Sequence, residues 1–372
     1  KNYPSQNDFV KEGIPFINAG HLVDGNVDFS SMNYISEEKY EKLGSGKIWN
    51  GDLLFCLRGS LGKKAIVENL DKAAIASSLV IIRCIDIFNR YLYYYLDSPI
   101  VEDLIFQSNN GSSQPNLSAK SVASFPIPVP PLSVQSSIVS ELDCINGILE
   151  KKREQIKELD ALAQSIFYHM FGDPIQNERG WEVKKLGDVC TSVNYGTSMP
   201  AVEGGKYKYL RMNNITYDGF LDLKDLKYIS VPDNEIEKCV VRRGDVLFNR
   251  TNSKELVGKT ALFDLDEDMI IAGYIIRVRV DTEKVLPLYI VRYMNTKYIK
   301  SYLSNLCKGA VNQANINSKE LRAIPLFLPP LSLQQAFAAK IEAIEKQKEL
   351  VKRSIAETET LLASRMQHYF EA

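Results

Sequence analysis

The sequence has few of the residues on which catalytic and metal sites usually depend. Its 372 residues include only three histidines, His21, His169 and His368, and its six cysteines are far apart with no C-x-x-C pair. This spacing argues against a zinc site or a disulfide framework and favours a reducing, cytoplasmic environment. We interpret His169 and His368 as packing or capping residues, His21 stands alone, and we predict no metal site.

Long apolar runs and excess charge of one sign are also missing. No apolar run approaches the ~18–20 residues that span a bilayer, and the polar start at Lys1 does not have the pattern of a signal peptide. We therefore predict no contact with a membrane. The formal net charge is −1. A strongly basic chain would have indicated nucleic acid, so any DNA binding must depend on local donors or on a partner.

Motifs for nucleotide and methyl-donor chemistry are missing as well. There is no Asp-Pro-Pro-Tyr or Asn-Pro-Pro-Tyr run, and no strand leads into a G-x-G-x-x-G turn. The nearest phosphate-loop pattern, "SKELVGKT" (Ser253–Thr260), has Ser253 in place of the first glycine, and the "ALFDLD" that follows is typical of a strand. "RGSLGK" (Arg58–Lys63) fits even less well. We predict a non-catalytic chain that needs no cofactor and binds no S-adenosylmethionine.

An internal repeat is the strongest positive feature. "FPIPVPPLSVQ" (Phe125–Gln135) returns 199 residues later as "IPLFLPPLSLQ" (Ile324–Gln334), and we call each stretch a proline joint. Upstream, "NGDLLF" matches "RGDVLF", "GKKAIV" matches "GKTALF", and "SQPNLSAKSV" matches "NQANINSKEL". The chain therefore contains two copies of one unit. Because Lys1 corresponds to about Asn194, we expect the first copy to be trimmed at its start.

The part of each copy before its joint has mixed character. "DLLFCL", "SLVIIRCI", "DVLFNR" and "YIIRVRV" are typical of short buried strands, whereas "NRYLYYYLDSP" and "VLPLYIVRYMNTKYIKSYL" indicate helices. The cluster of Tyr93, Tyr94 and Tyr95 is predicted to pack in the core with its hydroxyls at the surface.

A coiled-coil pattern follows each joint. From Ile138, apolar residues recur at alternating steps of four and three, interrupted at Lys152, and the second copy repeats this with interruptions at Lys348, Thr358 and Arg365. We predict helices from Ser133 to Phe171 and from Ser332 to Phe370, with the two serines as N-caps. The 39 residues of the first would form a rod of ~58 Å. Neither rod can bury its apolar seam alone, so we expect an antiparallel pair.

The predicted fold class is α+β, with a pseudo-two-fold internal repeat. Two similar globular α/β domains are separated by a pair of long antiparallel α-helices that form a coiled coil. The predicted boundaries are residues 1–131 for the first globular domain, 132–172 for the first helix, 173–330 for the second globular domain and 331–372 for the second helix.

The run "FGDPIQNERGWEVKKLGDV" (Phe171–Val189), the two "PPLS-x-Q" joints and the two long helices together resemble the specificity subunit of type I restriction–modification systems. The resemblance covers essentially the whole chain. It implies that each globular domain is a target-recognition domain that reads one half of a bipartite site in double-stranded DNA. It also implies that the helices set the spacing and bind two methyltransferase subunits, and that motor-nuclease subunits join in the full complex.

Candidate DNA-binding residues are donors in loops that border the repeated segments. Arginine suits guanine, asparagine and glutamine suit adenine, and lysine and serine suit phosphate. The candidates are Arg58, Ser60, Lys63, Gln114 and Asn116 in the first copy, and Arg211, Asn213, Asn214, Arg250, Asn252, Lys254, Gln313 and Asn315 in the second. Gln114/Gln313 and Asn116/Asn315 occur in both copies, which favours a shared backbone role for them, whereas the loops "GSLGK" and "TNSKELVGK" differ and suit the reading of different bases.

Two other hypotheses stay open at this point. The chain could be a coiled-coil scaffold whose two globular domains bind proteins and not DNA, which its near-neutral charge favours. A stand-alone enzyme is the third hypothesis, and the missing motifs argue against it.

Overall fold

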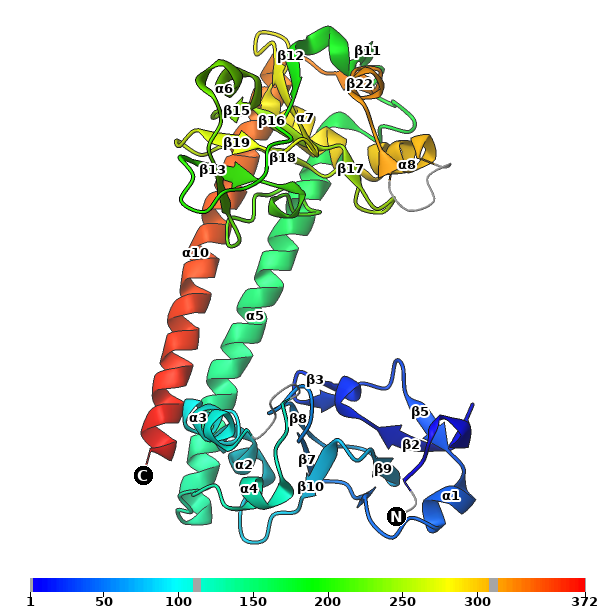
Figure 1. The fold of residues 1–372 in the computed structure, drawn as a ribbon, viewed down its shortest axis with the longest axis vertical. Helices are drawn as coiled ribbons and strands as arrows, with labels where there is room; N and C mark the ends of the chain where they lie inside the picture. Colours follow the sequence, from blue (N-terminus) through cyan, green and yellow to red (C-terminus); the bar gives the residue numbers. More distant parts are fainter. Residues whose placement is uncertain (1–2, 110–114, 308–313, 372) are drawn as a thin grey trace. The chain divides into compact units, whose positions relative to one another are not determined.

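The computed structural model describes residues 3–109, 115–307 and 314–371. The chain forms two compact units, Lys1–Ile156 with Leu350–Ala372, and Lys157–Glu349. Each unit contains a β-rich part, which we call its head, and segments of the two longest helices, α5 (Leu132–Phe171) and α10 (Leu331–Phe370) (Figure 1).

The first head contains a five-stranded sheet and a three-stranded sheet. The larger sheet has the order β1 (Phe9–Val10), β5 (Asn33–Ile35), β2 (Ile14–Ile17), β9 (Ala73–Ile75), β6 (Lys47–Ile48). The smaller one has the order β10 (Leu79–Ile82), β7 (Leu53–Cys56), β8 (Lys64–Ile66), and a separate hairpin joins β3 (Leu22–Val23) to β4 (Asn26–Val27). The helices are α1 (Glu37–Glu41), α2 (Asn89–Tyr95), α3 (Pro99–Ser108) and α4 (Ala119–Ala123), with short 3-10 turns η1 (Gln6–Asp8) and η2 (Ala19–His21).

The second head contains two four-stranded sheets and two short strand pairs. The sheets have the orders β12 (Cys190–Tyr195), β20 (Ile275–Val280), β16 (Val246–Asn249), β18 (Thr260–Leu262), and β14 (Lys227–Ile229), β13 (Tyr207–Leu210), β19 (Met269–Ile271), β15 (Val240–Val241). The pairs are β11 (Glu182–Lys185) with β22 (Pro325–Leu328), and β17 (Thr251–Asn252) with β21 (Ala314–Asn315). The helices are α6 (Asp233–Cys239), α7 (Pro287–Met294), α8 (Lys297–Leu306) and α9 (Ser318–Arg322), with turns η3 (Leu186–Val189) and η4 (Met212–Asn214).

The two heads repeat one topology. In the first, β7 pairs antiparallel with β10 and β8, and in the second β16 pairs antiparallel with β20 and β18. The parallel pair β2·β9 of the first head matches the parallel pair β13·β19 of the second. All four predicted strands and both predicted helical segments are therefore observed. Within the described residues, strands β11 and β12 of the second head have no counterpart in the first.

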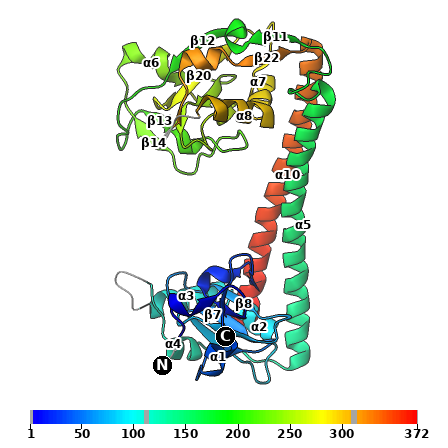
Figure 2. The ribbon, with the colours of Figure 1, turned by 90° about the vertical axis from the view of Figure 1, so that its right-hand side faces the viewer.

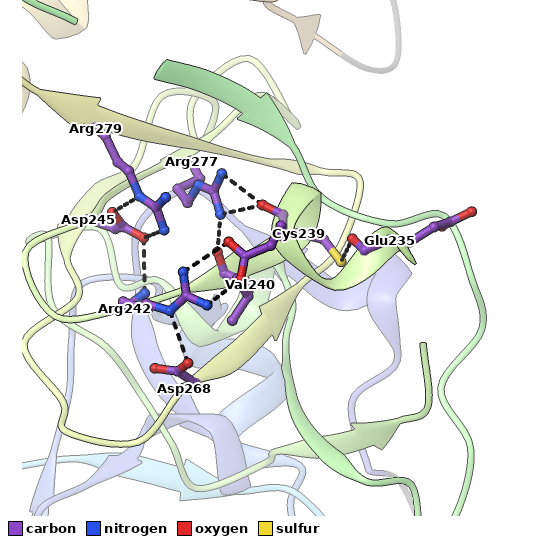
Figure 3. Close-up of polar contacts among 9 residues, drawn as sticks. Glu235, Cys239, Val240, Arg242, Asp245, Asp268, Arg277 and Arg279 are labelled. Atoms are coloured by element: carbon purple, nitrogen blue, oxygen red, sulfur yellow. Dashed lines mark hydrogen bonds and ion pairs between the residues drawn. The ribbon is translucent and has the colours of Figure 1, made fainter. Parts of the chain in front are cut away.

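A buried carboxylate holds the same place in both heads. Asp52, only 4% exposed, accepts hydrogen bonds from the Trp49 amide at 2.7 Å and from Arg83 Nε at 2.8 Å. Asp245, also 4% exposed, accepts from the Arg242 amide at 2.9 Å and from Arg279 Nε at 2.8 Å (Figure 3). Each carboxylate directly precedes the central strand. Its arginine partner lies at the end of the neighbouring strand β10 (Arg83) or within β20 (Arg279), so an ion pair as well as apolar burial holds these segments together.

The second head has a further buried arginine, Arg277, on the same strand as Arg279. The Arg277 guanidinium donates to the carbonyl oxygens of Glu237 and Val240 at the end of α6 (Figure 3). These carbonyls have no partner inside the helix, so the guanidinium caps them. Burial lowers the pKa of Arg277 from its ordinary value, the direction expected for a cation removed from water.

The long helices begin one residue earlier than predicted, and the predicted N-caps are wrong. The Pro131 carbonyl accepts from the amides of Val134 and Gln135, and the Pro330 carbonyl accepts from those of Leu333 and Gln334. Helices α5 and α10 therefore start directly after the last proline of each joint. Ser133 and Ser332 lie inside the first turn, where they cannot act as N-caps.

In each unit α5 and α10 pack against each other antiparallel. In the first unit Arg365 Nε lies 2.5 Å from Glu141 Oε1, and Lys152 Nζ lies 2.7 Å from Ser354 Oγ and from Thr358 Oγ1. In the second unit Lys348 Nζ lies 2.6 Å from Asp160 Oδ1. Figure 2 shows the ribbons of α5 and α10 running side by side. The polar residues that interrupt the apolar pattern are therefore all paired across the two helices. Lys152 and Thr358 bind each other, whereas Lys348 and Arg365 each bind a carboxylate on α5.

The tyrosine cluster differs from its prediction in one respect. Tyr94 and Tyr95 are buried as predicted, at 2% and 1% exposure. Their hydroxyls, however, are not at the surface: Tyr94 donates to Asp143 on α5 and Tyr95 donates to the Pro126 carbonyl at 2.6 Å. Burial raises the pKa of Tyr95 to about 12, so this hydroxyl remains a donor at neutral pH.

Candidate nucleic-acid interface

In the first head, the loop between β7 and β8 brings four of the candidate residues together. Arg58 forms a backbone bridge with Asn116, and the Leu117 amide donates to the Leu57 carbonyl at 2.8 Å. Ser60 and Lys63 follow in the same loop, where the Lys63 amide donates to the Ser60 carbonyl at 3.3 Å. The side chains of Arg58, Ser60, Lys63 and Asn116 are all exposed. The loop is therefore held by its backbone while its donors face solvent.

In the second head, the loop after β16 is held in the same way. Thr251 pairs with Asn315 through β17 and β21, as Arg58 pairs with Asn116, and the Ile316 amide donates to the Arg250 carbonyl at 2.9 Å. This arrangement groups Arg250 and Asn252 with Asn315, and Lys254 is exposed a few residues further on. The repeated pairing supports the predicted backbone role of Asn116 and Asn315.

Arg250 is positioned by neighbours that the sequence did not indicate. Its guanidinium carbon lies 4.9 Å from the centre of the Tyr195 ring, and Nε lies 3.4 Å from the Ile316 carbonyl oxygen. The Tyr195 hydroxyl in turn accepts from the Ser318 amide at 2.7 Å. A cation held over an aromatic ring loses less freedom when it binds a ligand.

The three candidates near η4 have different environments. Asn213 is exposed, whereas Arg211 binds the Asp225 carboxylate at 2.8 Å. Asn214 is 2% exposed, and its side chain accepts from the Arg211 amide at 2.8 Å and donates to the Asp222 carbonyl at 2.9 Å. His21 holds the matching place in the first head, where Nδ1 accepts from the Asn18 amide at 3.1 Å. We therefore do not carry Asn214 forward as a DNA ligand, because its amide is used inside the turn.

Two lysines, the buried Lys259 and the half-buried Lys300, connect the loops of the second head. Lys259 Nζ donates to the Met212 carbonyl at 2.9 Å and so joins the loop after β17 to η4. Lys300 Nζ donates to the Gly258 carbonyl at 2.8 Å and lies 5.4 Å from the centre of the Tyr217 ring. Burial and, to a smaller extent, the nearby Lys259 cation lower the pKa of Lys300 to about 8. Lys259 belongs to the "GKT" motif noted in the sequence, but nothing in the sequence indicated Lys300.

The motif "SKELVGKT" does not form a phosphate loop. Thr260 begins β18, as the strand pattern of "ALFDLD" predicted, and its hydroxyl donates to the Gly258 carbonyl at 3.1 Å. A phosphate loop would lead into a helix whose N-terminus faces the phosphate. The positive φ of +82° at Gly258 instead turns the chain directly into the strand.

Gln114 and Gln313 lie outside the described residues. Among the residues that are described, no group of three or more histidine, cysteine, aspartate or glutamate side chains could hold a metal ion. In the same ranges, no helix is both long enough and apolar enough to span a membrane.

Taken together, the fold and these loops define a class of protein in which two similar β-rich heads are each attached to a long helical pair and each present exposed hydrogen-bond donors. Residues 1–159 and 178–360 match the family described as type I restriction modification DNA specificity domain. The chain therefore belongs to the specificity subunits of type I restriction–modification systems, which determine DNA target recognition and are themselves non-catalytic.

Known relatives extend along most of the chain. The EcoKI specificity subunit of Escherichia coli K12 is 21% identical over 352 residues, which cover 89% of this chain and 75% of that protein. The MjaVIII specificity subunit of Methanocaldococcus jannaschii is 22% identical over 367 residues, which cover 91% of this chain and 83% of that protein.

Two solved structures share the fold. One comes from a study of complex assembly and conformational transition in the type I restriction–modification system, with a TM-score of 0.63, 22% identity, and 96% of this chain and 90% of that chain covered. The other is the S subunit from M. genitalium, with a TM-score of 0.51, 12% identity, and 99% and 92% covered.

Proposed function

We propose that each head reads one half of a bipartite site in double-stranded DNA through the loop that follows its central strand. The observation that carries this proposal is the pairing Arg58–Asn116 in one head and Thr251–Asn315 in the other. The same backbone frame holds two loops of different sequence. Two half-sites of different sequence require a shared frame with different loops. The frame keeps each loop in the same position on its head, and the different side chains bind different bases.

The donors on these loops suit bases and phosphates. Arg58 and Arg250 can bind guanine through two parallel hydrogen bonds, Asn252 and Asn213 can pair with adenine, and Lys63 and Lys254 can contact phosphate. A net charge of −1 agrees with this scheme if other subunits supply most of the phosphate contacts. The proposed partners are two methyltransferase subunits on the helices, and motor-nuclease subunits in the complete complex, which acts on cytoplasmic DNA.

The long helices are the proposed spacer between the half-sites. Forty residues in each of α5 and α10 correspond to a rod of ~60 Å. A coiled-coil scaffold that binds only proteins is the weaker alternative, because family membership assigns the chain to DNA target recognition.

The test is methylation mapping of DNA exposed to this chain together with its methyltransferase subunit. Arg250→Ala should change or relax recognition at one half-site and leave the other half-site unchanged. Arg243→Ala is the matched control, because Arg243 precedes β16, whereas Arg250 follows it, and Arg243 pairs with Asp266 on the surface. If Arg250→Ala and Arg58→Ala both left the methylated sequences unchanged, these loops would not read the bases.

A further inference from the structure

One glutamine side chain in each proline joint is completely buried. Gln135 is 1% exposed and Gln334 is 0% exposed, although both lie in the first turn of a long helix. Gln135 Oε1 accepts from the Phe88 amide at 3.0 Å, and its Nε2 donates to the Pro130 carbonyl at 2.9 Å. Each amide therefore makes contacts in two directions.

The second copy reproduces these contacts. Gln334 Oε1 accepts from the Leu286 amide at 2.8 Å, and its Nε2 donates to the Pro329 carbonyl at 2.9 Å and to the Lys284 carbonyl at 3.2 Å. Phe88 and Leu286 are the residues directly before α2 and α7. In each unit, one side chain on the long helix thus holds both the head and the proline joint.

Buried tyrosines complete the same attachment from the head. Tyr91 and Tyr95 on α2 donate to the carbonyls of Pro128 and Pro126, at 2.9 and 2.6 Å. On α7 of the second head, Tyr289 and Tyr293 donate to the carbonyls of Phe327 and Pro325, at 2.8 and 3.0 Å. Prolines have no amide hydrogen, so at the proline positions the joint offers only carbonyl oxygens to the tyrosines of the head.

We infer that Gln135 and Gln334 are positioning residues that fix the orientation of each head on its own helix and so make the spacing between half-sites selective. The argument rests on the function proposed above. A spacer helix can set a distance only if its attachment to the head does not bend. Removing a buried amide leaves a donor and an acceptor unsatisfied, which weakens the attachment without touching the residues that face DNA.

A purely structural role would have a different signature. It would lower thermal stability and would reduce methylation by the same factor at every spacing. A positioning role instead changes the ratio between spacings, because a loosened head can tilt to reach a half-site that lies one base pair too near or too far. The sequence read at each half-site stays the same in both cases.

The experiment uses the full chain in its complex with the methyltransferase subunit, and a DNA library with fixed half-sites and variable gaps. For Gln135→Leu and Gln334→Leu, the ratio of methylation at the preferred gap to methylation at gaps one base pair shorter or longer should fall about three- to tenfold, the change expected from losing one or two hydrogen bonds. Gln155→Leu and Gln347→Leu are matched controls at exposed positions of the same helices and should leave this ratio unchanged.

A conservative variant and a direct measurement keep the test decisive. Gln135→Glu retains the acceptor for the Phe88 amide but places a buried carboxylate oxygen against the Pro130 carbonyl, so it should lower the spacing ratio at least as much as Gln135→Leu. Hydrogen exchange on the wild-type chain, which requires no variant, should show slow exchange at the amides of Phe88 and Leu286. Rapid exchange there, or an unchanged spacing ratio in both leucine variants, would overturn the inference. If the wild-type complex itself shows no bipartite site, the proposed function fails and not the role of the glutamines.

Discussion

Lys348 Nζ lies 2.6 Å from Asp160 Oδ1 across the seam between α10 and α5. The lysine side chain is 4% exposed, whereas the aspartate is 49% exposed. The ammonium group also lies 3.2 Å from Glu345 Oε2 and 4.3 Å from the centre of the Phe220 ring. This buried cation is therefore neutralised by carboxylates from both helices, and Asp160 supplies the interhelical one.

Asp160→Asn should lower the free energy of unfolding by about 1–3 kcal/mol, because it leaves a buried ammonium with one carboxylate. Lys348→Met should cost less, because it removes the charge and keeps an apolar side chain of similar length in the seam. Urea denaturation measures both. Glu342→Gln, which removes the exposed pair with Lys346, is the control and should lower the free energy of unfolding much less than Asp160→Asn does. An equal loss in Asp160→Asn and in the control would contradict the buried-cation argument.

The long helices and the strands of the repeat were predictable because their signals are local. Alternating apolar steps from Ile138 and buried runs such as "DVLF" depend on residues close in sequence. The N-caps were not predictable from the serine rule, since the carbonyl of Pro131 already accepts the first helical hydrogen bonds and the helix starts before Ser133 can cap it.

The candidate site was only partly predictable, because long-range contacts decide which donors are available. Asn214 and Asn213 are adjacent in sequence, yet one amide is used inside η4 and the other faces solvent. Lys300 has the pattern of an exposed helical lysine, but its ammonium group donates a hydrogen bond to the Gly258 carbonyl in a distant loop. Tyr195, which supports Arg250, lies on a strand far away in the chain.

The buried carboxylate of Asp245 should contribute more to the stability of the second unit than an exposed carboxylate does. Asp245→Asn weakens the pair with Arg279 and the bond to the Arg242 amide, and should lower the free energy of unfolding of the second unit by about 2–3 kcal/mol. Asp266→Asn, which alters an ion pair whose aspartate is 90% exposed, is the control, with an expected loss below about 1 kcal/mol. Hydrogen exchange should locate the effect of Asp245→Asn in the second head. Faster exchange spread evenly over both heads would argue against a local role.

Stability of the second head should depend on pH through Lys300. Burial and Lys259 lower its pKa from 10.5 to about 8, and Asp218 opposes them. Between these two values the unfolded chain binds more protons than the folded chain, so stability rises with pH across this window. Below about pH 8 both states are protonated and the full cost of burying the charge is present.

Comparison with Lys300→Met isolates this effect. The difference in denaturation midpoint between wild type and variant should be constant below about pH 8 and should shift in favour of the wild type as the pH rises from there toward 10.5. Lys297→Met, at an exposed position in the first turn of the same helix, is the control and should show no such trend. A difference that did not change with pH across this window would show that Lys300 is not the titrating group.

The proposed spacer role of the helices can be tested by lengthening both of them together. Because Asp160 pairs with Lys348, an insertion in α5 alone would move one partner by about a turn and break the seam. Four residues should therefore be added after Glu158 in α5 and four after Leu350 in α10. This adds ~6 Å to the pair, and four residues make nearly a full turn, so the direction in which each head faces is almost kept. The unread gap should grow by about one or two base pairs at the ~3.4 Å rise of DNA, with both half-site sequences unchanged.

Two residues added at both places would rotate a head by about 200° and should abolish methylation. Methylation mapping distinguishes the outcomes. If the four-residue variant read different bases at the original spacing, the helices would not set the spacing, and specificity would not belong to the heads.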